Sequence, residues 1–166
     1  MALLPVADRW FERRRISDDI TLLWEPHVIP LMRCNIWHVR GRDRDLVIDT
    51  GMGVASLREA GRDLFGHKVT AVATHTHGDH IGGHHEFEHT LVHELEADNL
   101  RHPEDHGTLQ LAQLPPHYVK SLNDAGYVVD RDFITALPHS GYDMDGYRLN
   151  DAVVSEIVTE GDIVDL

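Results

Sequence analysis

The sequence has 166 residues, of which 42% are apolar, and this is enough for the core of one globular domain. We therefore predict a single domain over residues 1–166. The formal net charge of -13 at pH 7 disfavours nucleic acid as a partner, because binding phosphates requires a basic surface.

The amino-terminal segment does not read as a signal peptide, because Pro5, Asp8 and Arg9 interrupt the apolar run that secretion requires. No later segment is long and apolar enough to cross a membrane. We therefore expect a cytoplasmic protein without a membrane span. The arginines of this segment could contact an anionic partner, but the favoured interpretation is a solvated helix face without function. They are Arg9, Arg13, Arg14 and Arg15.

Three short runs rich in β-branched and aromatic residues predict an antiparallel opening sheet. They are residues 20–24, 35–39 and 45–48. Cys34, which precedes the second run, is the single cysteine of the chain, so an intrachain disulfide is excluded and a reducing compartment is indicated. We expect a buried thiol at this position.

A helix and a buried strand are predicted next. Apolar residues recur at helical spacing from Val54 to Leu64, and Gly66 supplies the stop. The following run, residues 69–74, is apolar without alternation, which is typical of a strand covered on both faces. This strand leads directly into a cluster of histidines.

The remaining chain predicts a strand at residues 90–92 and a short helix at residues 94–101. Residues 102–150 form a polar, partly helical insertion that is punctuated by prolines. Two further strands are expected at residues 152–158 and 162–166.

The histidine cluster, Thr-His-Thr-His-Gly-Asp-His at residues 74–80, has the spacing of a metal site. His75 and His77 are two residues apart at the end of an extended segment, so their side chains can leave the same face. Gly78 permits a turn that can bring Asp79 and His80 back to the end of the strand. Four ligands can therefore gather within six residues.

Imidazole nitrogens and a carboxylate suit zinc best, with iron or manganese as alternatives, and two neighbouring ions could share them. A bound metal would lower the pKa of a water molecule and polarise a carbonyl or phosphoryl oxygen. Asp79 could both bind the metal and orient the attacking hydroxide. The alternative is a histidine-rich loop that binds metals adventitiously, but the spacing and the Gly82-Gly83 pair that follows favour a true site.

These residues resemble the first metal-binding motif of the metallo-β-lactamase superfamily. Asp49-Thr50-Gly51 resembles the Asp-Thr-Gly element that precedes this motif, and the likeness runs from Ile20 to about Asn99. Residues 161–166 resemble a later element of the family. Within the family, three stretches are similar in particular to an acyl-CoA thioesterase-like member, namely residues 35–51, 71–75 and 92–94.

The resemblance implies an α/β fold, the amino-terminal portion of an αββα sandwich, with a mixed β-sheet, flanking helices and a metal pocket at one edge. It implies one zinc ion held by His75 and His77 and a second held by Asp79 and His80. Asp49 would support the loops of the site without binding metal, although the sequence alone equally allows an ordinary turn or helix-capping carboxylate. The implied activity is hydrolysis of an acyl thioester or related ester; opening of a lactone or β-lactam uses the same chemistry.

The sequence departs from the family pattern because the later ligands, a histidine, a bridging aspartate and a last histidine, have no recognisable counterpart here. We interpret His102, His106, His117 and His139 as surface residues. We expect a carboxy-terminally truncated domain, or a homo-oligomer that covers the exposed sheet face. The alternative function is therefore a catalytically inactive metal-binding fragment.

Overall fold

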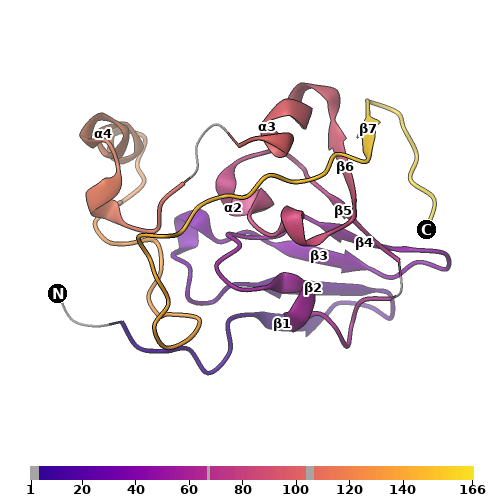
Figure 1. The fold of residues 1–166 in the computed structure, drawn as a ribbon, viewed down its shortest axis with the longest axis horizontal. Helices are drawn as coiled ribbons and strands as arrows, with labels where there is room; N and C mark the ends of the chain where they lie inside the picture. Colours follow the sequence, from indigo (N-terminus) through magenta and orange to yellow (C-terminus); the bar gives the residue numbers. More distant parts are fainter. Residues whose placement is uncertain (1–3, 67, 104–106) are drawn as a thin grey trace.

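The computed structural model describes residues 4–66, 68–103 and 107–166. Within these ranges the chain forms a seven-stranded sheet whose strands lie side by side in sequence order, from β1 to β7 (Figure 1). Strands β1 to β4 pair antiparallel, whereas β4 to β7 pair parallel. The mixed sheet is therefore confirmed. The strands are β1 (Glu12–Arg15), β2 (Ile20–Trp24), β3 (Ile36–Val39), β4 (Asp45–Ile48), β5 (Val69–Val72), β6 (His89–His93) and β7 (Glu156–Val158).

Arg13, Arg14 and Arg15 lie on the edge strand β1, and Arg9 precedes it outside any helix, so the interpretation as a helix face was wrong. β1 pairs with β2 along its whole length, with Glu12 opposite Trp24 and Arg15 opposite Thr21. Arg13 forms a bidentate ion pair with Asp63, at 2.7 and 2.8 Å. Exposed charges on an edge strand discourage pairing with another chain, and such charges fit a helical and an extended backbone equally well. Their pattern alone could not distinguish the two.

The helices are short and fall largely where the sequence predicts them. The predicted helix at residues 54–64 is reduced to one regular turn, α1 (Leu57–Ala60), which Ser56 caps by accepting from Glu59 N. The helix at residues 94–101 is present as a 3-10 turn, η3 (Glu94–Glu96), that continues into α3 (Ala97–Arg101). The others are α2 (Gly78–Ile81), α4 (Pro116–Asp124), and the 3-10 turns η1 (Pro30–Met32), η2 (His84–Glu86) and η4 (Leu111–Gln113).

The end of the chain differs from the prediction. β7 is shorter than the expected strand at residues 152–158, and residues 162–166 carry no strand. Asp162 accepts hydrogen bonds from Thr159 N and Thr159 Oγ1, which closes a turn, and Arg44 Nε donates to Asp165 O. Side-chain hydrogen bonds therefore hold this segment, whereas a strand would be held by backbone hydrogen bonds to its neighbour. No helix in the described part of the chain has the length and apolarity to cross a bilayer.

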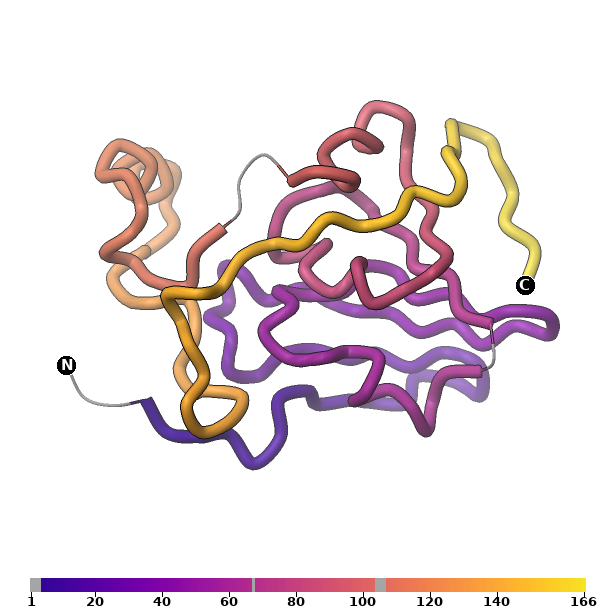
Figure 2. Tube along the Cα trace, viewed as in Figure 1, coloured from indigo at the N-terminus to yellow at the C-terminus, as the bar shows by residue number. Residues whose placement is uncertain are grey.

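The main hydrophobic core includes Leu23, Ile36, Val47, Ala71 and Phe87, residues from the middle of the sheet and its covering loops. A second cluster joins α2, β6 and α3. Residues 107–150 of the expected insertion lie at one end of the sheet with α4 at the tip (Figure 1), and the chain then runs back across the molecule to β7 (Figure 2). Ala152 N donates to Leu100 O along this return path.

Candidate metal centre

The candidate site forms where β4 and β5 end. Parallel neighbouring strands finish at the same edge of a sheet, so Asp49, just after β4, lies beside Thr74, just after β5. Asp49 N donates to Val72 O at 2.8 Å, and Asp49 accepts hydrogen bonds from Thr74 N and Thr74 Oγ1, each at 2.8 Å. Asp49 has a φ of 57°, a left-handed conformation that aspartate tolerates better than most residues. The carboxylate is thereby fixed at the edge of the sheet.

The side chains of His75 and His77 lie close together. Their ring centroids are 4.7 Å apart, and the ring of His75 lies 4.0 Å from that of His80. Thr76, between them, is buried on the opposite side, where its amide and hydroxyl donate to Glu96 and Asn99 Nδ2 donates to its carbonyl oxygen. These contacts hold the residue between the two histidines, while His75 is partly exposed and His77 is exposed.

His80 connects the two carboxylates of the site through its two ring nitrogens. Its Nδ1 lies 2.8 Å from Asp49 Oδ2, and its Nε2 lies 3.5 Å from Asp79 Oδ2. Burial alone would lower the pKa of His80, but the hydrogen bond to Asp49 and the charges of Asp79 and Asp49 raise it. Burial opposes ionisation of Asp49, but hydrogen bonds from His80 and Thr74 outweigh it and lower the pKa of Asp49. Asp49 is therefore an anionic acceptor for the Nδ1–H group of His80.

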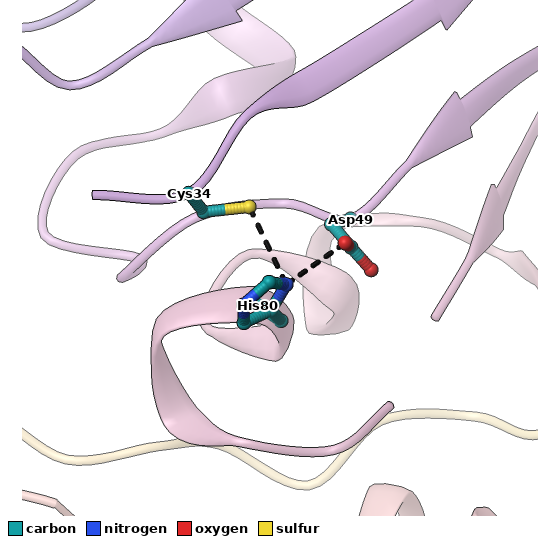
Figure 3. Close-up of side chains that lie close together, drawn as sticks. All are labelled: Cys34, Asp49 and His80. Carbon is teal, nitrogen blue, oxygen red and sulfur yellow. Dashed lines mark hydrogen bonds and ion pairs between the residues drawn. The ribbon is translucent and has the colours of Figure 1, made fainter. Parts of the chain in front are cut away.

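Cys34 lies beside the same ring nitrogen as Asp49, with its Sγ 3.6 Å from His80 Nδ1 (Figure 3). In the described residues, Cys34, Asp49 and His80 are the one group that brings three donor atoms within 4.8 Å of one another, so they could hold a metal ion. An ion bound to His80 Nδ1 would replace the hydrogen bond from this nitrogen to Asp49, and burial raises the pKa of the thiol. The Nε2 side of His80, which faces Asp79, is the other position at which an ion could be held.

The atoms on that side fit a zinc ion. Two ligands of a tetrahedral zinc lie about 3.3 Å apart, because zinc–nitrogen and zinc–oxygen bonds are about 2.0–2.2 Å long. The separation of 3.5 Å between His80 Nε2 and Asp79 Oδ2 is close to this value. Histidine ligands of metals commonly donate their other ring N–H to a carboxylate, as His80 does to Asp49. The two ligand atoms and the hydrogen bond from His80 to Asp49 therefore both suit the zinc ion that the sequence implies.

The loop at residues 49–53 and the segment at residues 80–83 interlock through their backbones. Thr50 N donates to His80 O at 2.7 Å, and Gly82 N donates to Gly51 O at 2.8 Å. A Cβ atom on Gly82 would lie 2.1 Å from the Met52 carbonyl, and one on Gly53 would lie 2.2 Å from Gly82 O. Glycine is required here because the two backbones are in contact.

His84 is buried beside the same junction of the two backbones. It is 0% exposed, and its Nδ1 lies 2.7 Å from Thr50 Oγ1, which also bonds to His80 O and Gly83 N. Its Nε2 is buried and has no hydrogen-bond partner among the described residues. Burial lowers the pKa of His84 to about 4. A neutral imidazole therefore supports the loop at neutral pH.

Glu25 lies behind the loop at residues 49–53 and is only 1% exposed. Trp10 Nε1 donates to its Oε1 and Met52 N donates to its Oε2, each at 2.8 Å. Burial raises the pKa of Glu25 to about 7, although both hydrogen bonds lower it, and the charge of Asp79 raises it further. A buried carboxyl group thus faces the back of the candidate site.

The other histidines take little part in this geometry. His102, His117 and His139 are exposed, as predicted, while His106 lies outside the described residues. Sequence reasoning missed the buried roles of Glu25 and His84. A charged residue directly after the apolar run of β2 was the only signal for Glu25, and the only signal for His84 was its place shortly after the histidine cluster.

Replacement of Gly82 tests the interlock. We expect Gly82→Ala to lower the free energy of unfolding by about 3 kcal/mol or more, because the new methyl group meets backbone atoms that cannot move aside. Gly126→Ala is the control: its φ of 93° is strained for alanine, yet no atom lies within 4 Å, so a cost of about 1–2 kcal/mol is expected. Urea unfolding measures both, and equal losses would contradict the interlock.

The buried state of His84 predicts a pH dependence. Its pKa is lower in the folded than in the unfolded chain, so the unfolded chain alone takes up a proton as pH falls from about 6.5 to about 4. We expect this group to remove about 3 kcal/mol of stability across that interval. His84→Phe should lose this component of the pH profile, whereas His117→Phe, at an exposed position, should retain it. Identical profiles for the two variants would refute the assignment.

Comparison with known proteins gives independent information on the family of this chain. Residues 29–155 match the metallo-beta-lactamase superfamily. The chain is 31% identical to the acyl-coenzyme A thioesterase MBLAC2 of Homo sapiens, over 95% of this chain and 54% of that protein. It is 32% identical to the protein of the same name from Gallus gallus, with the same coverage. The chain spans about half the length of the curated relatives it matches.

Solved structures show the same fold. The subclass B3 metallo-beta-lactamase BJP-1 of Bradyrhizobium japonicum aligns with a TM-score of 0.55 at 17% identity, over 96% of this chain and 50% of that one. The metallo-beta-lactamase of Cronobacter sakazakii aligns with a TM-score of 0.54 at 13% identity, over 93% of this chain and 50% of that one. The family match over residues 29–155 and the shared fold lead to one conclusion: this chain belongs to the metallo-β-lactamase superfamily.

Proposed function

We propose that this chain provides the metal-holding part of a hydrolase that uses a metal-activated water to cleave an acyl thioester or a related ester. His75 and His77 would hold one zinc ion, and Asp79 and His80 a second. Bound zinc supplies a nucleophilic hydroxide at neutral pH and polarises the carbonyl group that it attacks. Iron or manganese would serve the same role with these ligands.

The observation that carries the proposal is that the two ring nitrogens of His80 have different partners. Its Nδ1 is bonded to Asp49 at 2.8 Å, its Nε2 lies 3.5 Å from Asp79 Oδ2, and its ring centroid lies 4.0 Å from that of His75. Asp79 is intermediate in exposure, and its carboxylate can hold or orient a proton of the attacking water while it binds the ion. Asp49 keeps the imidazole in the tautomer that leaves Nε2 free for metal.

The substrate class is supported by the relatives, which are named acyl-coenzyme A thioesterases, at 31 and 32% identity. The β-lactamase structures are only 13 and 17% identical, so they support the fold and not a β-lactam or lactone substrate. We therefore place the thioester before the lactone or β-lactam.

The second candidate is a metal-binding unit that catalyses no hydrolysis by itself. The observation that favours it is that, in the described residues, no three of His75, His77, Asp79 and His80 bring their donor atoms within 4.8 Å of one another; the group that does so is Cys34, Asp49 and His80. Additional ligands would then come from another copy of the chain, in a homo-oligomer, or from further sequence. The two candidates share the same metal-holding residues and differ in turnover.

Thioester turnover tests the proposal. We expect the zinc-loaded protein to release free thiol from an acyl-CoA, and His77→Ala to lower kcat/KM by more than the roughly 10- to 100-fold that loss of an outer partner of a metal ligand costs. His117→Ala changes an exposed histidine of α4 and should retain full activity. Zinc-loaded protein that cleaves no acyl-CoA, while a longer version does, would establish the metal-binding unit and reject hydrolysis by this chain.

A further inference from the structure

Glu25 is a buried carboxyl group for which the proposed reaction has no role. It follows β2 directly and is 1% exposed, among apolar neighbours such as Ile36 and Trp10. Burying a carboxylate is unfavourable unless hydrogen bonds compensate for lost water. The hydrogen bonds of Glu25 therefore indicate which part of the structure this carboxyl group stabilises.

The two carboxylate oxygens hold two donors from distant parts of the chain. Oε1 accepts from the indole Nε1 of Trp10, and Oε2 accepts from the backbone N of Met52, both at 2.8 Å. Oε2 also packs so closely on Gly51 that a Cβ there would lie 2.4 Å away. Because the two donors reach different oxygens, a carboxylate satisfies both at once.

The loop that Glu25 holds leads directly to His80. Gly51 O accepts from Gly82 N at 2.8 Å, and Thr50 N donates to His80 O at 2.7 Å. Asp49, at the start of the same loop, accepts from the His80 ring. A shift of the loop would therefore displace the backbone of His80 and the carboxylate that orients its imidazole.

We propose that Glu25 is a positioning residue of the metal centre: by fixing the loop at residues 49–53 through Met52, it sets the orientation of His80. This inference rests on the proposed function, because the orientation matters when His80 binds a metal. It assigns no contact between Glu25 and the ion or the substrate.

Glu25→Gln tests the inference, because glutamine keeps the shape but offers one acceptor oxygen and an NH2 group that opposes one of the two donors. We expect zinc affinity, measured by competition with a chromogenic chelator, to fall roughly tenfold. In the zinc-free protein, hydrogen exchange at the amides of Thr50 and Gly82 should accelerate. Exchange at these amides reports on the junction with residues 80–83 without any metal.

Two further variants separate positioning from a general loss of stability. Asp45→Asn removes another buried carboxylate, which accepts from His38 Nε2, Gly41 N and Gly66 N at the start of β4, far from Asp49 along that strand. It should lower stability and leave zinc affinity unchanged. Trp10→Phe combined with Glu25→Gln removes the opposed donor, so the amide oxygen can accept from Met52 N and zinc affinity should recover towards the wild-type value.

The outcomes are distinct. Equal zinc affinity and equal Thr50 and Gly82 exchange in Glu25→Gln and Asp45→Asn would overturn the inference, and so would a double variant as weak as Glu25→Gln alone. Wild-type protein that binds no zinc would contradict the proposed function instead. In that case the exchange comparison in zinc-free protein still decides whether Glu25 holds the junction.

Discussion

The site depends on the hydrogen bond between Asp49 and His80. A histidine can present either ring nitrogen to a metal, and the partner of the other nitrogen decides which one. Asp49 Oδ2 lies 2.8 Å from Nδ1, and Thr74 donates to both carboxylate oxygens of Asp49. The ends of β4 and β5 thus fix the carboxylate, which fixes the imidazole. The parallel pairing of these strands is the part of the fold that makes this contact possible.

Close backbone contacts and two buried polar side chains support this hydrogen bond. The backbones of residues 49–53 and 80–83 touch, which requires glycine at positions 53 and 82. His84 and Glu25 are buried on either side of that junction, one as a neutral imidazole and the other as a carboxyl group with two donors. Each of them is a polar group in a dry environment, where hydrogen bonds are strong and misplacement is costly. The result is a rigid support for side chains that themselves remain accessible.

Local sequence patterns predicted much of the fold. The strands β2 to β6 and the segment at residues 94–101 follow from short apolar runs and their turns, and the histidine motif is contiguous, so its four side chains could be named directly. β1 was missed because a run of exposed arginines shows neither the alternation typical of a strand nor the spacing typical of a helix. Glu25 and His84 were missed because their partners, Met52 and Thr50, are 27 and 34 residues away in sequence. Only the folded chain shows such pairings.

The most direct test of this account is the state of the His80 ring in the zinc-loaded protein, read by long-range 1H–15N NMR with His80→Gln to assign the signals. The account predicts a protonated Nδ1, in a hydrogen bond to Asp49, and a metal-shifted Nε2 without a proton. A protonated Nε2, or ring signals that zinc does not change, would contradict the claim that Asp49 directs His80 towards the metal.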